Sequence, residues 1–148
     1  MTTSPSITRF IGEAERTLQA LLRHQLQQVG MTFAQWVAMT VLSGGPLPVT
    51  RFTEAIAAAR VVPAGEELQV ADDLVEKGFV AGGSEISMTE RGLDVFRPLR
   101  GRVSDLTTSL VAEMPADDLA ATRRVLEILT HRATQMLVGD VGHATTGR

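Results

Sequence analysis

The chain has 148 residues, an apolar fraction of 44% and a net charge of −3, so it is long enough for one globular domain and too apolar to be disordered. It contains no cysteine, which excludes disulfides, thiolate metal sites and cysteine nucleophiles. The N-terminus lacks a basic head followed by an apolar run, and no stretch approaches about 18 uninterrupted apolar residues. We therefore expect a cytoplasmic protein without a membrane segment.

The first elements in the chain are predicted to be helices. Apolar residues over 6–29 recur at helical spacing, which predicts a long amphipathic helix that ends near Gly30. Thr32 and Gln35 have the spacing of a capping box. The helix that follows is apolar nearly all round and should be buried. A short helix over 50–59 comes next.

The middle of the chain has the order of a recognition helix and a wing. Pro63 suits the first position of a helix that ends at Gly78, a residue that favours a left-handed C-terminus. Its expected buried stripe consists of Val70, Ala71, Leu74 and Val75. Residues 79–81 and 86–88 are strand candidates joined by a hairpin connection.

Two long helices complete the predicted fold. The first spans 89–113 and contains Pro98, which should kink or divide it. The second spans 116–138, and a frayed tail is expected from Gly139. The terminal helices over 6–29 and 116–138 are too apolar for the small globule they could cover, so packing against a twofold mate is the economical arrangement.

This order of elements resembles the MarR family of winged helix-turn-helix regulators. Three segments carry the resemblance: 31–36 with Leu42, 74–80, and the Met-Thr-Glu-Arg-Gly segment 88–92, which is similar to the family's Leu-Thr-x-x-Gly segment. The resemblance implies an all-α fold with a minimal two-stranded wing, in a single domain over 1–148. The winged helix-turn-helix would occupy 32–92, between the dimerisation helices.

The resemblance implies a homodimeric transcriptional regulator that binds double-stranded DNA, with the recognition helix in the major groove and the wing in the minor groove. An enzyme is not expected, and neither is a cofactor or a metal. The three histidines are isolated, without metal-ligand spacing. Adjacent acidic pairs, at 72–73 and 117–118, point to different helix faces and do not converge as acid–base partners would.

Six residues are the candidates for contact with DNA. Arg51 and Arg60 flank the third helix and would meet phosphates, and Gln69 has the side chain to bind adenine in a bidentate manner. For the arginines the alternative is a solvated surface side chain, and for Gln69 an ordinary exposed helix residue. The full set is Arg51, Arg60, Glu66, Gln69, Lys77 and Arg91.

Two departures from the family pattern favour an alternative function. Residues 63–77 carry five acidic side chains against Lys77, a net charge of −4, which repels nearby phosphates. Residues 81–85, the expected wing loop, contain no Lys or Arg. The alternative is a MarR-like dimer that has lost DNA binding and uses its acidic former recognition helix as a protein-interaction module.

The family's ligands often bind between the dimerisation helices and the winged module, which implies a small aromatic or apolar effector here. Trp36 is the sole tryptophan, and its alternative interpretation is a core residue; His24 is alternatively a surface or interface histidine. The residues expected to line such a pocket are Arg16, His24, Trp36, Met39 and Phe96.

Overall fold

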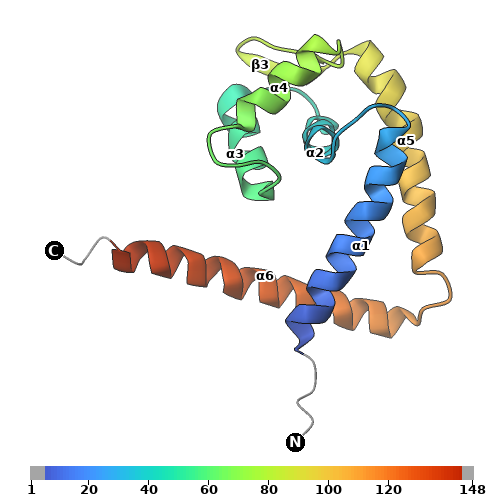
Figure 1. Ribbon diagram of the computed structural model, residues 1–148, viewed down its shortest axis with the longest axis vertical. Helices are drawn as coiled ribbons and strands as arrows, with labels where there is room; N and C mark the ends of the chain where they lie inside the picture. Colours follow the sequence, from blue (N-terminus) through green and yellow to red (C-terminus); the bar gives the residue numbers. More distant parts are fainter. Residues whose placement is uncertain (1–5, 145–148) are drawn as a thin grey trace, which may run out of the picture. The chain divides into compact units, whose positions relative to one another are not determined.

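The computed structural model describes residues 6–144, with side chains through residue 139. The chain divides into two compact units, one that ends at Leu106 and one that begins at Thr107 (Figure 1). The helices and strands, in chain order, are α1 (Ile7–Gln27), α2 (Phe33–Leu42), β1 (Leu47–Pro48), α3 (Val49–Ala59), α4 (Glu67–Glu76), β2 (Val80–Ala81), β3 (Glu85–Met88), α5 (Glu90–Leu110) and α6 (Ala116–Ala144).

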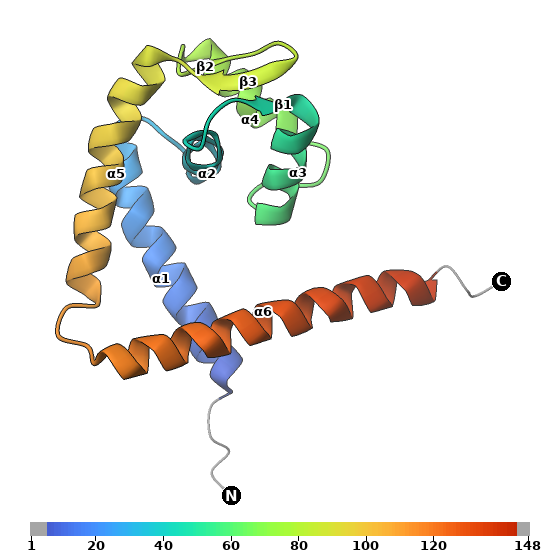
Figure 2. The same ribbon diagram turned by 180° about the vertical axis from the view of Figure 1, so that it is seen from behind.

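Helix α2 is the centre of the first unit. In Figures 1 and 2 it lies in the middle, with α3 and α4 to one side and α1 and α5 to the other. The predicted capping box is confirmed: the Gln35 amide donates to Thr32 Oγ1 and the Thr32 amide donates to Gln35 Oε1, each at 3.1 Å. The predicted burial of α2 is also confirmed, for Trp36, Ala38, Met39 and Leu42.

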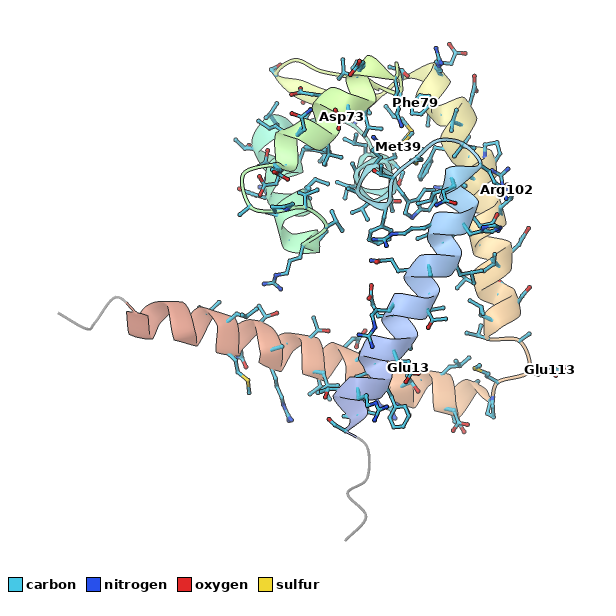
Figure 3. The ribbon with its side chains drawn as sticks, viewed as in Figure 1. Glu13, Met39, Asp73, Phe79, Arg102 and Glu113 are labelled. Atoms are coloured by element: carbon cyan, nitrogen blue, oxygen red, sulfur yellow. The ribbon has the colours of Figure 1, made fainter. Side chains whose placement is uncertain are left out.

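The hydrophobic core of the first unit receives side chains from most of its elements. Met39 lies among the side chains gathered around α2 (Figure 3). The other large, fully buried core side chains are Leu26, Leu42, Phe52, Ile56, Leu74, Phe96 and Leu99. A helix that buries such side chains on several faces can hold α3 and α4 in a fixed relation, because the core is close-packed.

The predicted hairpin of β2 and β3 is confirmed, and β1 adds a third antiparallel strand that the sequence did not indicate. The strand order is β1-β3-β2, with Leu47 opposite Ile86 and Val80 opposite Met88. A strand of two residues, one of them proline, gives no alternation to recognise. Strand β3 of the wing therefore pairs with β1, the segment that leads into α3.

Helix α4, the predicted recognition helix, is shorter than the sequence predicted. Pro63 does not occupy its first position, because residues 63–66 form a turn in which the Glu66 amide donates to the Pro63 carbonyl at 3.1 Å. The helix begins at Glu67. Val70, Ala71 and Leu74 are buried as predicted, but Val75 is 43% exposed. Gly78 ends the helix region with a φ of +77°, the left-handed conformation that the sequence predicted.

The two long C-terminal helices also differ from their predicted form. Pro98 does not divide α5, which runs unbroken from Glu90 to Leu110. Helix α6 continues to Ala144, so residues 139–144 are helical instead of frayed. The remainder of the predicted tail, 145–148, lies outside the described residues.

Thr89 joins the wing to α5 through three hydrogen bonds. Its hydroxyl donates to the Gly78 carbonyl at 2.6 Å and accepts from the Gly92 amide at 3.0 Å. Its own amide donates to the Phe79 carbonyl at 3.0 Å. Thr89 thus caps α5 and ties its start to the end of the α4 segment. This explains in physical terms the Thr-x-x-Gly pattern of residues 89–92.

Candidate nucleic-acid interface

The outward side of α4 carries two parallel rows of side chains. Residues three, four and seven apart on a helix lie on one face. One row therefore consists of Leu68, Asp72 and Val75, and the other of Gln69, Asp73 and Glu76. Leu68 and Val75 are 46% and 43% exposed. The face that a winged helix presents to a major groove is in this chain both acidic and apolar.

Gln69, the candidate for reading a base, is already bonded within α4. Its Nε2 donates to Asp73 Oδ1 at 2.9 Å, and Asp73 is labelled in Figure 3. Bidentate binding of adenine needs the amide hydrogens as well as the amide oxygen. Gln69 would have to leave Asp73 or share its donors between Asp73 and the base.

Glu66 and Glu67 lie where α4 begins. Glu66 is exposed and occupies the N-cap position without a side-chain capping bond. Glu67 Oε2 accepts from the Gly65 amide at 3.0 Å. Carboxylates here interact favourably with the helix dipole, but they also occupy the end of the helix that would otherwise attract a phosphate.

Arg51 and Arg60 are exposed, as a contact with phosphate requires. Arg51 lies in the first turn of α3, and Arg60 caps its C-terminus in a left-handed conformation, with φ of +54°. Neither takes part in the salt bridge between Arg123 and Glu127. The structure does not bring these two arginines together, since they lie at opposite ends of α3.

Lys77 is held by the protein itself. Its Nζ donates to the Gly30 carbonyl at 2.5 Å and to Gln35 Oε1 at 2.9 Å. The sequence offered no sign of this, because the partners precede Lys77 by 47 and 42 residues. Of the six DNA candidates it is the one whose charged group is hydrogen-bonded to a distant part of the fold.

Arg91 lies at the base of the wing. Its guanidinium carbon is 5.8 Å from the centre of the Phe79 ring, a distance at which a cation is attracted to the ring face. The side chain is exposed. Residues 79–88 contain no Lys or Arg, and Arg91 is the first cation that follows the wing in the chain.

A groove lies between α1, the start of α2 and the turn after α3. It consists of two adjoining hollows of about 410 and about 460 Å³, both lined by Arg23, Phe33 and Val61. The Arg23 guanidinium carbon is 6.0 Å from the centre of the Phe33 ring. Arg60 also lines the second hollow. This groove could not be predicted from the sequence, because its walls come from three segments with no shared motif.

The five residues predicted to form a ligand pocket are distributed differently. Trp36, Met39 and Phe96 belong to the buried core, and the rings of Trp36 and Phe96 are 5.2 Å apart between centroids. Arg16 and His24 are exposed on α1. None of the five lines the two hollows of the groove. The assignment of these residues to a ligand pocket stays a prediction.

Apolar side chains are exposed on helices of both units. On α1 they are Ile7, Phe10 and Leu18. On α6, Leu126 is 40% exposed, and the other large exposed apolar side chains are Val125, Ile128, Met136, Leu137 and Val138. Large apolar side chains left exposed on a helix indicate an interaction surface when they gather on one face.

Two other kinds of site are absent from the described residues. No group of three or more His, Asp or Glu side chains there is placed to hold a metal ion. None of the described helices is long and apolar enough to cross a membrane.

Comparison with known proteins identifies the fold. No protein-family model matches the sequence, and no curated protein matches it either. Solved structures do match. Ligand-free NadR has a TM-score of 0.72 at 15% identity, over 88% of this chain and 99% of that one. The oxidised form of MarR from E. coli has a TM-score of 0.67 at 21% identity, over 86% and 96%.

A third match is a MarR-family protein of Mycobacterium tuberculosis in complex with DNA, with a TM-score of 0.68 at 21% identity, over 85% of this chain and 98% of that one. The match covers most of both chains. The fold of this chain is therefore the winged helix fold of the MarR-family regulators.

Proposed function

We propose that the chain is a transcriptional regulator of the MarR type, which binds operator DNA as a homodimer through its winged module. The observation that carries the proposal is the match over more than four-fifths of the chain with regulators of this fold, one of them in complex with DNA. Fold alone does not fix function, so the charges and contacts of the interface must be weighed as well.

The dimer is supported by the apolar surface of α1 and α6. Each helix exposes several large apolar side chains. A second copy would bury them by the same surface on both partners, as closed twofold symmetry requires. Two winged modules held in this way would meet half-sites about one helical turn of DNA apart.

Contacts with phosphate fall to the arginines around α3 and the wing. Arg51, Arg60 and Arg91 are exposed, and neutralising phosphates with such side chains supplies sequence-independent affinity. Sequence reading falls to α4, where a carboxylate accepts a hydrogen bond from cytosine N4 and Gln69 binds adenine. We expect few phosphate contacts and a correspondingly shallow dependence of affinity on salt.

The experiment that tests this function is a titration of the purified protein against labelled DNA from upstream of its own gene, at several salt concentrations. We expect binding that is selective over a random duplex of equal length and that weakens as salt rises. Equal and weak binding to both duplexes at low salt would overturn the proposal.

The acidity of α4 favours the second candidate, a dimer that binds a basic protein partner and no longer reads DNA. The charge of residues 63–77 sums to −4, and the single cation there, Lys77, is bonded to Gly30 and Gln35. Both observations reduce the attraction of α4 to DNA. The two candidates differ in what removal of negative charge from α4 should do.

A double substitution, Glu66→Gln with Asp73→Asn, separates the candidates. If α4 enters the major groove, each carboxylate lies near phosphates and repels them by about 1 kcal/mol in water. Removal of two carboxylates from each protomer should therefore tighten operator binding at low salt by about thirtyfold or more. The matched control, Glu13→Gln with Glu113→Gln, changes the charge equally on exposed residues outside the winged module. Equal changes in the two variants would favour the protein-binding candidate.

The groove beside Arg23 is our proposed site for a small effector. Arg23 would pair with an anionic group, while Phe33 and Val61 would contact an apolar or aromatic body. NadR, one of the structural matches, has been crystallised with 4-hydroxyphenylacetate. We expect Arg23→Gln to abolish any change in operator affinity that 4-hydroxyphenylacetate causes in the wild type; an unchanged response in the variant would exclude this groove.

A further inference from the structure

We propose that Lys77 is a positioning residue that fastens the C-terminal end of α4 to the corner between α1 and α2, and so couples the recognition helix to the groove beside Arg23. This role replaces the DNA contact that the sequence suggested. The consequence for DNA rests on the proposed function, whereas the fastening itself does not.

The contacts of Lys77 place it at the end of α4 and direct its charge toward the α1–α2 corner. Its backbone amide donates to the carbonyls of Asp73 and Val75, which makes it the C-cap of the helix. Its Nζ donates to the Gly30 carbonyl and to Gln35 Oε1. A cation at this end also interacts favourably with the helix dipole. The side chain is half-buried.

Gln35 is the acceptor that makes the arrangement specific. It is 6% exposed and is the one buried polar residue in the part of the chain that the structure describes. Its Oε1 accepts twice, from the Thr32 amide at 3.1 Å and from Lys77 Nζ at 2.9 Å. A hydrogen bond from a charged donor is stronger than a neutral one. The capping box of α2 and the end of α4 therefore share one oxygen atom.

The same corner forms a wall of the groove. Gln27, Met31 and Thr32 line one of its hollows, and Gly30 lies between them in the chain. A ligand that displaces residues 27–32 would move the Gly30 acceptor directly, and it would act on the Gln35 acceptor through the hydrogen bond from the Thr32 amide. Such a displacement would reach α4 through two hydrogen bonds and would need no contact between the ligand and the recognition helix.

Hydrogen exchange of the α4 amides tests the fastening without DNA. We would compare the wild type with Thr32→Ala, which removes the acceptor of the Gln35 amide, with Lys77→Met, and with the double variant. Ser43→Ala is the matched control, because it removes a hydroxyl that bonds to the Thr40 carbonyl at the other end of α2. Amides of α5 serve as an internal reference for a global loss of stability.

We expect exchange at the C-terminal turn of α4 to accelerate on the order of tenfold in each single variant, relative to α5. The double variant should exchange no faster than Lys77→Met, because the loss of Lys77 already removes the hydrogen bond that connects Thr32 and Gln35 to α4. Ser43→Ala should leave α4 unchanged. Unaltered α4 exchange in Thr32→Ala, or accelerations that multiply in the double variant, would overturn the coupling.

Operator binding provides the second readout. A positioning role predicts that Lys77→Met weakens binding without altering the slope of affinity against salt, and that Gln35→Leu, at a buried position, has the same effect. A slope reduced by about one for each protomer of the bound dimer would make Lys77 a phosphate contact and overturn the proposal. If the wild type binds no operator, the proposed function fails, while the exchange measurements still decide whether Lys77 fastens α4.

Discussion

Replacing Gly92 by alanine should destabilise the winged module by about 2 kcal/mol or more. A Cβ at this position would lie 2.1 Å from the Phe79 carbonyl oxygen and 2.9 Å from Met88 Cγ. The Phe79 oxygen cannot withdraw easily, because it accepts from the Thr89 amide. Overpacking of a buried site costs about 1–3 kcal/mol, and the clash here is with backbone. Urea denaturation of the variant would measure the loss.

Gly101→Ala is the matched control for this substitution. Gly101 lies in the same helix and is exposed, and beyond the adjacent helix backbone an added Cβ would meet nothing within 4 Å. Alanine there should stabilise the protein by about 0.5–1 kcal/mol, because it restricts the unfolded chain and favours the helix. If both variants were equally stable, the close approach of α5 to Phe79 would be refuted.

Substitution of Gly92 should also affect function, because Gly92 belongs to the contacts that hold the wing. Thr89 bonds to Gly78 and Phe79 on one side and to Gly92 on the other. The start of α5, the end of the α4 segment and the wing are therefore held by one group of contacts. Loss of the close approach should loosen the wing and the C-terminal end of α4 together.

The features that the sequence predicted correctly are those with local causes. The capping box of Thr32 and Gln35 depends on residues three apart, and both of its hydrogen bonds are present. The burial of α2 follows from an apolar composition on nearly every face of that helix. Gly78 adopts the left-handed conformation for which glycine has no steric penalty.

The features that the sequence missed depend on contacts between distant segments. Strand β1 exists because Leu47 pairs with Ile86 across the fold, and two residues carry no period of their own. Pro63 suited a helix start by itself, but residues 63–66 form a turn and α4 begins at Glu67.

In the candidate site, too, features with local causes could be predicted from the sequence, and features that depend on distant segments could not. The acidic character of α4 could be counted directly along the sequence, and the structure shows Asp72 and Glu76 exposed there. The bond from Gln69 to Asp73 follows helical spacing and was accessible to sequence reasoning. The partners of Lys77 were not, because Gly30 and Gln35 belong to another part of the chain. Charge was thus predictable, whereas the availability of each charge was not.

Replacing Leu126 by glutamate should convert the proposed dimer to monomers. Leu126 is 40% exposed on α6, in a row with Leu119 and Leu137 at helical spacing. Twofold symmetry would place two such carboxylates in one apolar interface, and burial of an unpaired charge costs several kcal/mol. We expect the dimer dissociation constant to rise by about a hundredfold or more, as measured by sedimentation equilibrium.

The control for this prediction is Gln135→Glu, which adds the same charge to an exposed position about 180° around α6 from Leu126. It should remain dimeric. Operator binding should fall with dimerisation in Leu126→Glu alone, because a monomer occupies one half-site and loses the effective concentration of the second module. If Gln135→Glu dissociated instead, the interface would lie on the opposite face of α6. If both variants remained dimeric, α6 would not belong to the interface.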